Sequence, residues 1–151
     1  MVTSTTAAPD QEFCAIARTL DVLRERWALL ILRDAFNGVR RFDDLRRSTG
    51  APRQVLSGRL AHLVDQGLLD RVPYQEPGQR IRHEYRLTAS GRDLYPVFLA
   101  MFRWGDRHRP VPPGTGYDLT HRDCGEPVDV VLRCAGGHEL DSVREVERIE
   151  P

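Results

Sequence analysis

Four side chains that can hold a metal ion lie in the last third of the chain, at His121, Cys124, Cys134 and His138. They form two pairs of nitrogen and sulfur donors, spaced His-x2-Cys-x9-Cys-x3-His, and four such donors are the ligand set of a structural zinc site. The pattern predicts a small zinc-knuckle-like element. The alternative is surface histidines beside two idle or buried cysteines, and a disulfide between Cys124 and Cys134 is less favoured in a reducing compartment.

Cys14 is the third cysteine, and an odd number of cysteines argues against a disulfide scaffold. It lies beside the predicted start of a helix, with Arg18 one turn later. Both features favour the thiolate form, which reacts with oxidants and electrophiles. Cys14 is therefore a candidate reactive thiol, and the alternative is a small side chain buried between subunits.

A third group of polar side chains is suited to nucleic acid. Arginine pairs with guanine, glutamine pairs with adenine, and serine contacts a base or a phosphate. Arginines on a hairpin can contact phosphates or enter the minor groove. The candidate DNA-binding residues are Arg53, Gln54, Ser57 and Arg59 on a predicted helix, with Arg80 and Arg82 on a predicted hairpin.

The charge distribution supports a polyanionic partner. All 22 basic residues are arginine, and the net charge is zero. Residues 40–92 nevertheless carry 11 arginines against 6 acidic residues, whereas residues 1–39 have a net charge of −1 and residues 93–151 have −4. A basic middle third is expected when one surface meets DNA, and the alternative is chance clustering.

These side chains need elements that position them. A helical pattern begins at Phe13, and a stronger one continues from Val22 to Phe36, where Asn37-Gly38 is a stop signal. Residues 40–42 are predicted to be extended.

The middle of the chain predicts two helices joined by a turn. A short helix spans Asp43 to Arg47, residues 48–51 form the turn, and Pro52 begins a helix that runs to about Gln66, with Gly67 as its stop.

A hairpin and a long helix follow. Strands are predicted over residues 69–74 and 81–87 around the turn at Pro77-Gly78, and Thr88 caps one long last helix. Residues 111–116 are a predicted linker, and residues 117–151 are an acidic C-terminal extension with strand character at 128–132.

This order of elements predicts a winged helix-turn-helix, a mainly α fold with a small β-hairpin wing. The major groove admits one helix, and side chains in its N-terminal half reach the base edges. The helix from Pro52 is the candidate recognition helix, and residues 75–82 are the candidate wing tip. The alternative is an ordinary amphipathic helix with a solvated polar face.

The sequence also resembles the HxlR-type transcriptional regulators over about Cys14 to Arg109. The resemblance rests on segments 14–23, 26–33, 41–46, 55–60 and 84–91, with Leu63 and Gly67-Leu68-Leu69 following the predicted recognition helix. One departure is Gly58, where a longer polar residue is expected. Glycine has no side chain that could make a base contact at that position.

The resemblance implies a homodimer, formed through the first and last helices. A dimer reads a pseudo-palindromic operator whose half-sites lie about one helical turn apart. Some members sense oxidants through an N-terminal cysteine, and Cys14 matches that position. The expected dimer-interface residues, which can also pack within one chain, are Phe13, Ile16, Leu20, Leu94, Phe98, Met101 and Phe102.

Other functions are less favoured. The sequence has no phosphate loop, nucleophile elbow or metal-binding histidine pair on one helix, so an enzyme is not expected. An alternative is an effector- or partner-binding module with secondary DNA affinity, using a pocket near Trp27, Phe98 and Trp104 for an aromatic ligand; these residues also suit plain core packing. No cofactor is expected apart from the zinc.

The sequence also predicts where the protein works. Its longest apolar run, Trp27 to Leu32, is too short to span a membrane, and residues 1–12 resemble a disordered tail rather than a signal peptide. We therefore expect a cytoplasmic bacterial protein.

Overall fold

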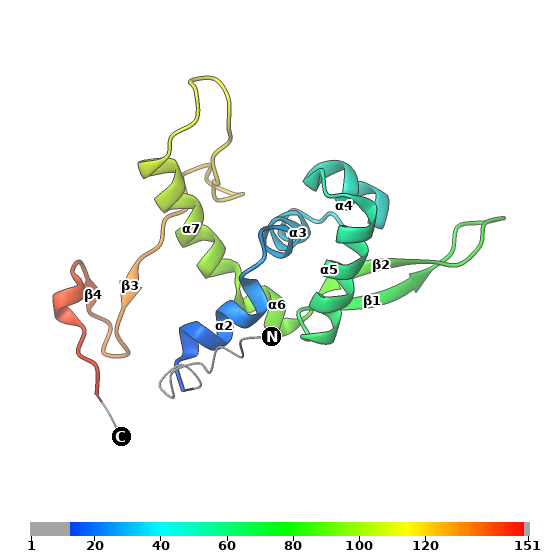
Figure 1. The fold of residues 1–151 in the computed structure, drawn as a ribbon. Coiled ribbons are helices and arrows are strands. Elements are labelled where there is room, and N and C mark those ends of the chain that lie inside the picture. The colour runs from blue at the N-terminus through cyan, green and yellow to red at the C-terminus, as the bar shows by residue number, and fades with distance from the viewer. Residues whose placement is uncertain (1–12, 150–151) are drawn as a thin grey trace, which may run out of the picture. The chain divides into compact units, whose positions relative to one another are not determined.

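The computed structural model describes residues 13–149, and the predicted disorder of residues 1–12 lies outside this range. The chain divides into two compact units between Tyr95 and Pro96. The first unit has the order α2 (Ala15–Leu23), α3 (Arg26–Phe36), α4 (Phe42–Thr49), α5 (Arg53–Asp65), β1 (Leu69–Tyr74), β2 (Arg82–Leu87) and α6 (Ala89–Asp93) (Figure 1). Then follow α7 (Tyr95–His108), β3 (Leu132–Arg133), β4 (Glu139–Leu140) and the 3-10 helix η1 (Val143–Glu145).

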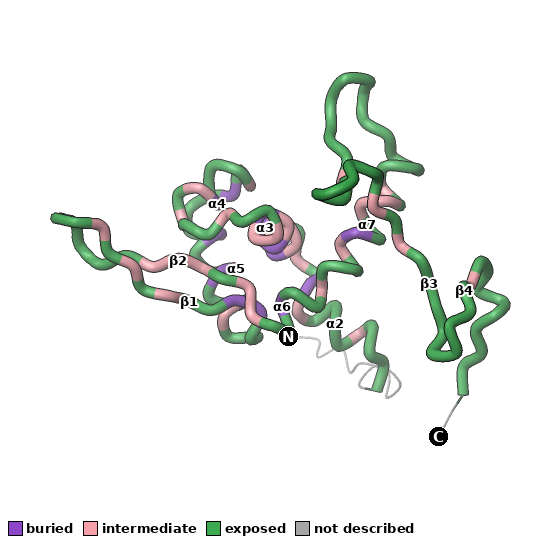
Figure 2. Tube along the Cα trace, turned by 180° about the vertical axis from the view of Figure 1, so that it is seen from behind, coloured by how far each residue is buried: buried purple, intermediate pink, exposed green. Residues whose placement is uncertain are grey.

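The core of the first unit lies between α3, α4, α5 and the start of β1. Each of these elements turns an apolar stripe inward, as the periodicity of the sequence predicts. Figure 2 shows the buried positions gathered along these facing segments. The largest fully buried side chains are Ile31, Leu32, Leu45, Leu56, Leu60, Leu63 and Leu69.

The wing is an antiparallel pair of strands, and its register runs from Leu69 opposite Leu87 to Tyr74 opposite Arg82. The predicted extended piece joins its edge: Arg41 bridges to Glu84, and the Tyr85 amide donates to the Arg40 carbonyl at 2.8 Å. The hairpin prediction is confirmed, although the second strand begins at Arg82 rather than at residue 81.

Thr88 ties the end of the wing to the following helix. Its hydroxyl donates to the Gly67 carbonyl at 2.7 Å and accepts from the Gly91 amide at 3.0 Å, so the predicted cap is confirmed. Gly91 is buried against the chain at Leu68, and a Cβ there would sit far inside van der Waals contact of the Leu68 carbonyl oxygen. Only glycine permits this close approach.

The expected single last helix is wrong, because α6 ends at Asp93 and α7 begins at Tyr95. Pro96 explains the interruption. Proline has no amide to donate back to the preceding turn, and its ring restricts the residue before it, so a helix cannot run through this position unbroken.

In the second unit, Arg103 fastens the C-terminal extension to α7. Its guanidinium donates to the Val128 carbonyl, to the Leu119 carbonyl at 3.1 Å and to the Asp118 carboxylate at 2.7 Å. The Phe102 and Tyr117 rings stack at 5.3 Å. The extension therefore has defined contacts with the helix before it.

The predicted strand at residues 128–132 is largely wrong. The extension pairs Leu132 with Leu140 and Arg133 with Glu139, and the four residues before Leu132 are not in a strand. Alternating apolar side chains suggest a strand, but the turn at Gly136-Gly137 sets which residues can pair. Within residues 13–149, no helix is long and apolar enough to cross a bilayer.

Candidate nucleic-acid interface

The helix-turn-helix consists of α4, a tight turn and α5. Gly50 adopts a positive φ of 72°, which ends α4 and turns the chain. Ala51 is buried, and its amide donates to the Thr49 hydroxyl at 3.2 Å. Asp34 of α3 holds the other side of α4, because its buried carboxylate accepts from the Ser48 hydroxyl at 2.6 Å. The angle of α5 is therefore fixed by local contacts.

The N-terminal half of α5 exposes three of the predicted DNA-binding side chains together. Arg53, Gln54 and Ser57 are exposed and line, with Phe42, a shallow cavity of about 400 Å³. The Arg53 guanidinium lies 5.1 Å from the centre of the Phe42 ring. That contact orients a cation beside polar side chains at the end of the helix that would enter a groove.

The same face of α5 continues with small residues. Ser57, Gly58 and Ala61 are exposed, and a Cβ at Gly58 would have no atom of the described chain within 4 Å. The first acidic residue on this helix is Asp65, at its end. The face therefore lets another molecule approach the helix backbone closely, and it carries no repelling charge until the last turn.

Arg59 lies apart from the other candidates on α5. Its guanidinium is 3.6 Å from the Glu25 carboxylate, at the start of α3. A step of two residues beyond Ser57 turns a helix by about 200°, so the two side chains leave opposite sides of α5. Its predicted DNA contact stays untested.

The wing tip presents the remaining two candidates. Arg80 and Arg82 are both exposed, and Gly78 at the turn has a φ of 75°. The base of the tip is held by Arg41, whose guanidinium lies 4.6 Å from the Tyr74 ring centre and 2.8 Å from the Glu76 carboxylate. The extended piece before α4 therefore orients the wing.

The sequence reasoning missed additional basic side chains near the helix-turn-helix. Arg40, Arg41 and Arg47 line a shallow cavity of about 560 Å³ with Asp44 and Ser48, among others. The sequence did contain a signal for them, because residues 40–92 hold 11 arginines and only four of these were among the predicted DNA-binding residues. These arginines lie on α4 and between α4 and the wing, where Glu76 and Asp44 partly compensate the charges of Arg41 and Arg47.

Cys14 lies at the N-terminal cap of α2 and is exposed. Its carbonyl accepts from the Arg18 amide at 3.1 Å, which places Cys14 at the first turn as expected. Cys124 and Cys134 are exposed as well. Accessibility alone therefore does not distinguish Cys14 from the other two thiols.

The expected dimer-interface residues fall on both units. Phe13 precedes α2, and 84% of its surface is exposed. Ile16 and Leu20 lie on α2, and 72% and 53% of their surfaces are exposed. Met101 of α7 is exposed, whereas Leu94, Phe98 and Phe102 are half-buried. Large apolar side chains this exposed are typical of surfaces that another chain covers.

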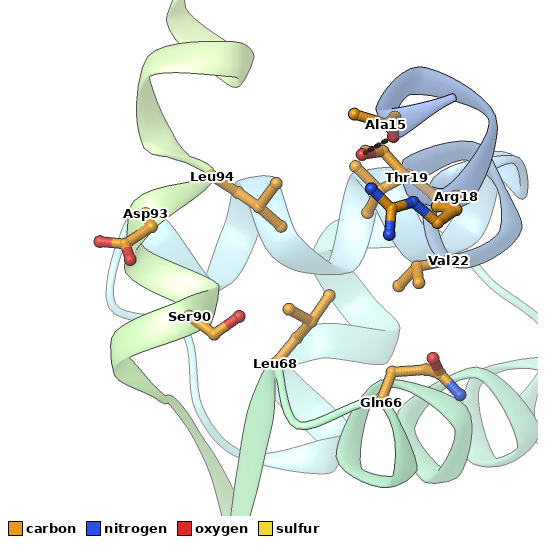
Figure 3. Close-up of a pocket in the computed structure, with 10 residues that line it drawn as sticks. Ala15, Arg18, Thr19, Val22, Gln66, Leu68, Ser90, Asp93 and Leu94 are labelled. Carbon is orange, nitrogen blue, oxygen red and sulfur yellow. Dashed lines mark hydrogen bonds between the residues drawn. The ribbon is translucent and has the colours of Figure 1, made fainter. Parts of the chain in front are cut away.

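The predicted ligand pocket was assigned to Trp27, Phe98 and Trp104. Trp27 lies on α3, and Phe98 and Trp104 lie on α7 in the second unit. Trp104 is exposed, and its ring lies 5.1 Å from the His108 ring. The role of these residues in ligand binding stays a prediction, and a cavity of the first unit (Figure 3) has other lining residues.

The four predicted zinc ligands lie in two separate pairs. His121 Nδ1 is 3.2 Å from Cys124 Sγ, and Cys134 Sγ is 3.5 Å from His138 Nδ1. Within residues 13–149, no three histidine, cysteine or acidic side chains come together as a metal site. A structural zinc needs four ligands, so the donors fit in type but not in their placement. The zinc site stays a prediction for metal analysis of the purified protein.

Known sequences are similar to most of this chain. The profile of the HxlR-like helix-turn-helix family matches residues 22–113. An uncharacterized HTH-type transcriptional regulator of Mycobacterium tuberculosis is 48% identical over 132 residues, which cover 87% of this chain and 82% of the relative. The uncharacterized HTH-type regulator YybR of Bacillus subtilis is 32% identical, over 68% of this chain and 82% of its own length.

Solved structures share the fold. PA1607, a candidate transcription factor, has a TM-score of 0.81 at 35% identity, covering 91% of this chain and 95% of that one. The reduced form of the redox regulator HypR has a TM-score of 0.57 at 30% identity, covering 64% and 94%. The reduced form of the transcriptional regulator YodB from B. subtilis has a TM-score of 0.55 at 25% identity, covering 66% and 98%.

Proposed function

Because the chain belongs to the HxlR-like helix-turn-helix family, we propose that it is a one-component transcriptional repressor that binds a pseudo-palindromic operator as a homodimer, and not an enzyme. The observation that carries this proposal is the exposed face of α5. Arg53, Gln54 and Ser57 lie together at its N-terminal end, and small residues follow them.

The face of α5 matches the needs of the major groove. Arg53 offers a bidentate donor for guanine, Gln54 offers a donor and an acceptor for adenine, and Ser57 reaches a base or a phosphate. The open space around Gly58 permits close approach of the helix. In this proposal α5 reads the base sequence.

The wing supplies contacts that do not depend on sequence. Arg80 and Arg82 extend from an exposed hairpin and suit phosphates or a narrow minor groove. Arg40 and Arg47 provide additional charge beside α4. The wing and α4 would thus contribute to affinity and to the salt dependence of binding.

A homodimer accounts for the exposed apolar residues of α2. Phe13, Ile16 and Leu20 are exposed in the described part of the chain, and this exposure supports the proposal. Burial against a second copy would remove them from water and would place two α5 helices on successive half-sites, about 34 Å apart on B-DNA.

Fluorescence anisotropy tests the proposal with DNA from upstream of the protein's own gene. A scrambled duplex of equal length is the control, and both are titrated at several salt concentrations. We expect tighter, salt-dependent binding to the native duplex. Equal affinity for both duplexes at every salt concentration would contradict operator recognition and would favour the effector- or partner-binding module.

Two arginine variants separate base reading from phosphate contact. Arg53→Ala is expected to weaken binding to the native duplex by about 1–3 kcal/mol, whereas Arg80→Ala weakens binding to both duplexes and lowers the salt slope by about 1. Arg122→Ala, which removes an exposed arginine of the second unit, is the matched control and should change neither. If Arg53→Ala weakens binding to the native and the scrambled duplex by the same free energy, Arg53 does not read a base.

For the signal, we propose that Cys14 reacts with oxidants. The support is its exposed position at the start of α2 and the similarity to the redox regulators HypR and YodB. Diamide would take one hydrogen from each of two Cys14 thiols, leaving a disulfide between protomers and the reduced hydrazine.

The thiol proposal has a matched control within the chain, because all three cysteines are exposed. We expect diamide to give a covalent dimer on a non-reducing gel and to change operator affinity in the wild type and in a Cys124→Ser, Cys134→Ser double variant. Cys14→Ser should show neither response. A full response in Cys14→Ser would reject this role.

A further inference from the structure

The first unit contains a cavity of about 500 Å³ that none of the DNA-binding residues lines. Its walls come from α2, the end of α5, the start of β1 and α6 (Figure 3). This volume lies within the range of about 300–1,000 Å³ that small-molecule sites occupy. The lining residues used below are Arg18, Val22, Gln66, Leu68, Ser90 and Leu94.

The cavity has apolar side chains on both of its walls and a positive charge on α2. Val22, Leu68 and Leu94 turn their side chains toward the same space in Figure 3. Arg18 lies one turn before Val22 on α2, and within residues 13–149 its guanidinium makes no ion pair. Asp93 lies at the rim with its carboxylate directed away from the other labelled side chains. The cavity therefore favours an anionic group attached to an apolar body.

We propose that this cavity binds a small carboxylic acid with an aromatic or branched aliphatic body, and that this acid is an effector of the DNA-binding function proposed above. Arg18 would hold the carboxylate through two parallel N–H donors, as arginine does with planar anions. The Ser90 hydroxyl supplies a further donor, and the apolar body would rest on Leu68 and Leu94. The proposal rests on the chain being a DNA-binding regulator.

The floor of the cavity is fixed to the rest of the first unit. The Leu68 carbonyl accepts from the Thr88 amide at 3.1 Å, and the Thr88 hydroxyl holds the Gly67 carbonyl. Gly91 packs directly on the backbone at Leu68. A bound acid would therefore press against a rigid floor on this side.

The opposite wall is α2, which has fewer buried residues. Leu23 is its only buried residue within the helix, so α2 is the element that can adjust when the cavity is occupied. Arg18 and Val22 face the cavity, whereas Ile16 and Leu20 are about 100–200° around the helix and face the expected partner protomer. Occupancy would thus change how the dimer helix lies relative to Gln66 at the end of α5.

This placement couples the ligand to DNA. A ligand that binds two arrangements of α2 with different affinity shifts the balance between them, and the operator responds by the same coupling free energy. Spacing between the two recognition helices of a dimer decides whether both half-sites are reached. The acid therefore would change operator affinity without touching DNA.

Binding is tested on the full-length protein with three carboxylate probes: benzoate, phenylacetate and 2-methylbutanoate. Benzyl alcohol and benzylamine are the neutral and cationic controls. We expect at least one carboxylate to bind by calorimetry and to shift the amide signals of Val22, Leu68 and Ser90 in NMR spectra. The controls should bind at least tenfold more weakly.

Two variants locate the site, and a third serves as the control. Arg18→Gln should weaken carboxylate binding about tenfold, whereas Arg24→Gln removes an arginine of the same segment that does not line the cavity and should leave binding unchanged. Ser90→Leu fills the cavity from an exposed position and should also reduce binding. Circular dichroism and a melting curve confirm that each variant is folded.

The outcomes distinguish this proposal from the DNA-binding proposal. The cavity proposal alone is overturned if the unliganded protein binds its operator but no carboxylate binds the protein. It is also overturned if the operator is bound and Arg18→Gln and Arg24→Gln bind the probe equally. Carboxylate binding that leaves operator affinity unchanged overturns the effector role. Loss of operator preference in the unliganded protein is the separate failure of the proposed function.

Discussion

The Asp34 carboxylate, which is almost wholly buried, accepts a hydrogen bond from the Ser48 hydroxyl at 2.6 Å and another from Arg33 Nε at 2.7 Å. The Ser48 contact joins α3 to α4 across 14 residues of sequence, whereas Arg33 is the neighbour of Asp34 on α3. A buried carboxylate is tolerated only when such donors surround it. Asp34 therefore sets where α4 lies and, through the following turn, where α5 points.

Ser48→Ala should destabilise the fold by about 1.5–3 kcal/mol, because it removes a hydrogen bond to a buried charged acceptor. Urea denaturation followed by circular dichroism measures the change. Ser57→Ala is the matched control on the next helix: its hydroxyl is exposed, so stability should change by less than about 0.5 kcal/mol while DNA binding weakens. Equal stability losses in both variants would contradict this role of Asp34.

Gly91→Ala should destabilise the protein by about 1–3 kcal/mol or prevent folding, because the new methyl group collides with the Leu68 backbone. Gly105→Ala on α7 is the control, since a Cβ there meets no atom within 4 Å. That change should be neutral or slightly stabilising, because alanine favours a helix over glycine. Thermal melting of the two variants tests the difference, and similar melting temperatures would contradict it.

Gly58→Ala should stabilise the protein by about 0.5–1 kcal/mol, because it removes a glycine from the interior of α5 and fills only open space. Gly58→Leu should leave the fold intact and reduce operator affinity, because its larger side chain blocks the close approach of α5. Parallel melting curves and anisotropy titrations separate the two effects. Unchanged operator affinity in Gly58→Leu would place this part of α5 outside the DNA contact.

The contact of Asp118 with α7 should depend on pH. A hydrogen bond from Arg103, supported by the Leu119 amide, lowers the pKa of Asp118 below its ordinary value of 3.8. Because the pKa is lowered in the folded state, the Asp118 carboxylate stabilises the fold at pH values above its ordinary pKa. This stabilisation is lost as the pH falls through the lowered pKa. NMR titration of the Leu119 amide should show its shift at that lower pH, and Asp118→Asn should abolish the transition.

The sequence was most informative about the first unit. Apolar periodicity predicts the helices that bury Leu32, Leu56 and Leu60, and the turn at Pro77-Gly78 predicts the hairpin. Local rules succeed there because α3, α4, α5 and the start of β1 each present one apolar side to one core. The same rules wrongly predicted one helix through Leu94, because the apolar pattern continues across this position. The helix is interrupted there because Pro96 has no backbone amide to donate.

The candidate site was predictable in part. Helical spacing places Arg53, Gln54 and Ser57 on one face, as the structure does. It does not reveal that Arg59 meets Glu25 at 3.6 Å, because that pairing depends on how α3 packs against α5. Likewise, spacing alone suggested that four tail donors surround one metal, whereas the backbone turns keep them as two pairs.

The anchoring of the extension by Arg103 bears on where the protein can be cut. A chain that ends at residue 113, where the family profile ends, would lose Asp118, Leu119 and Val128. These three residues accept the hydrogen bonds that the Arg103 guanidinium donates. The guanidinium would stay beside Phe102, but water would replace the protein acceptors that fix its position. A fragment that ends at or after Val128 keeps all of these acceptors, and it therefore keeps α7 in the surroundings that the structure shows.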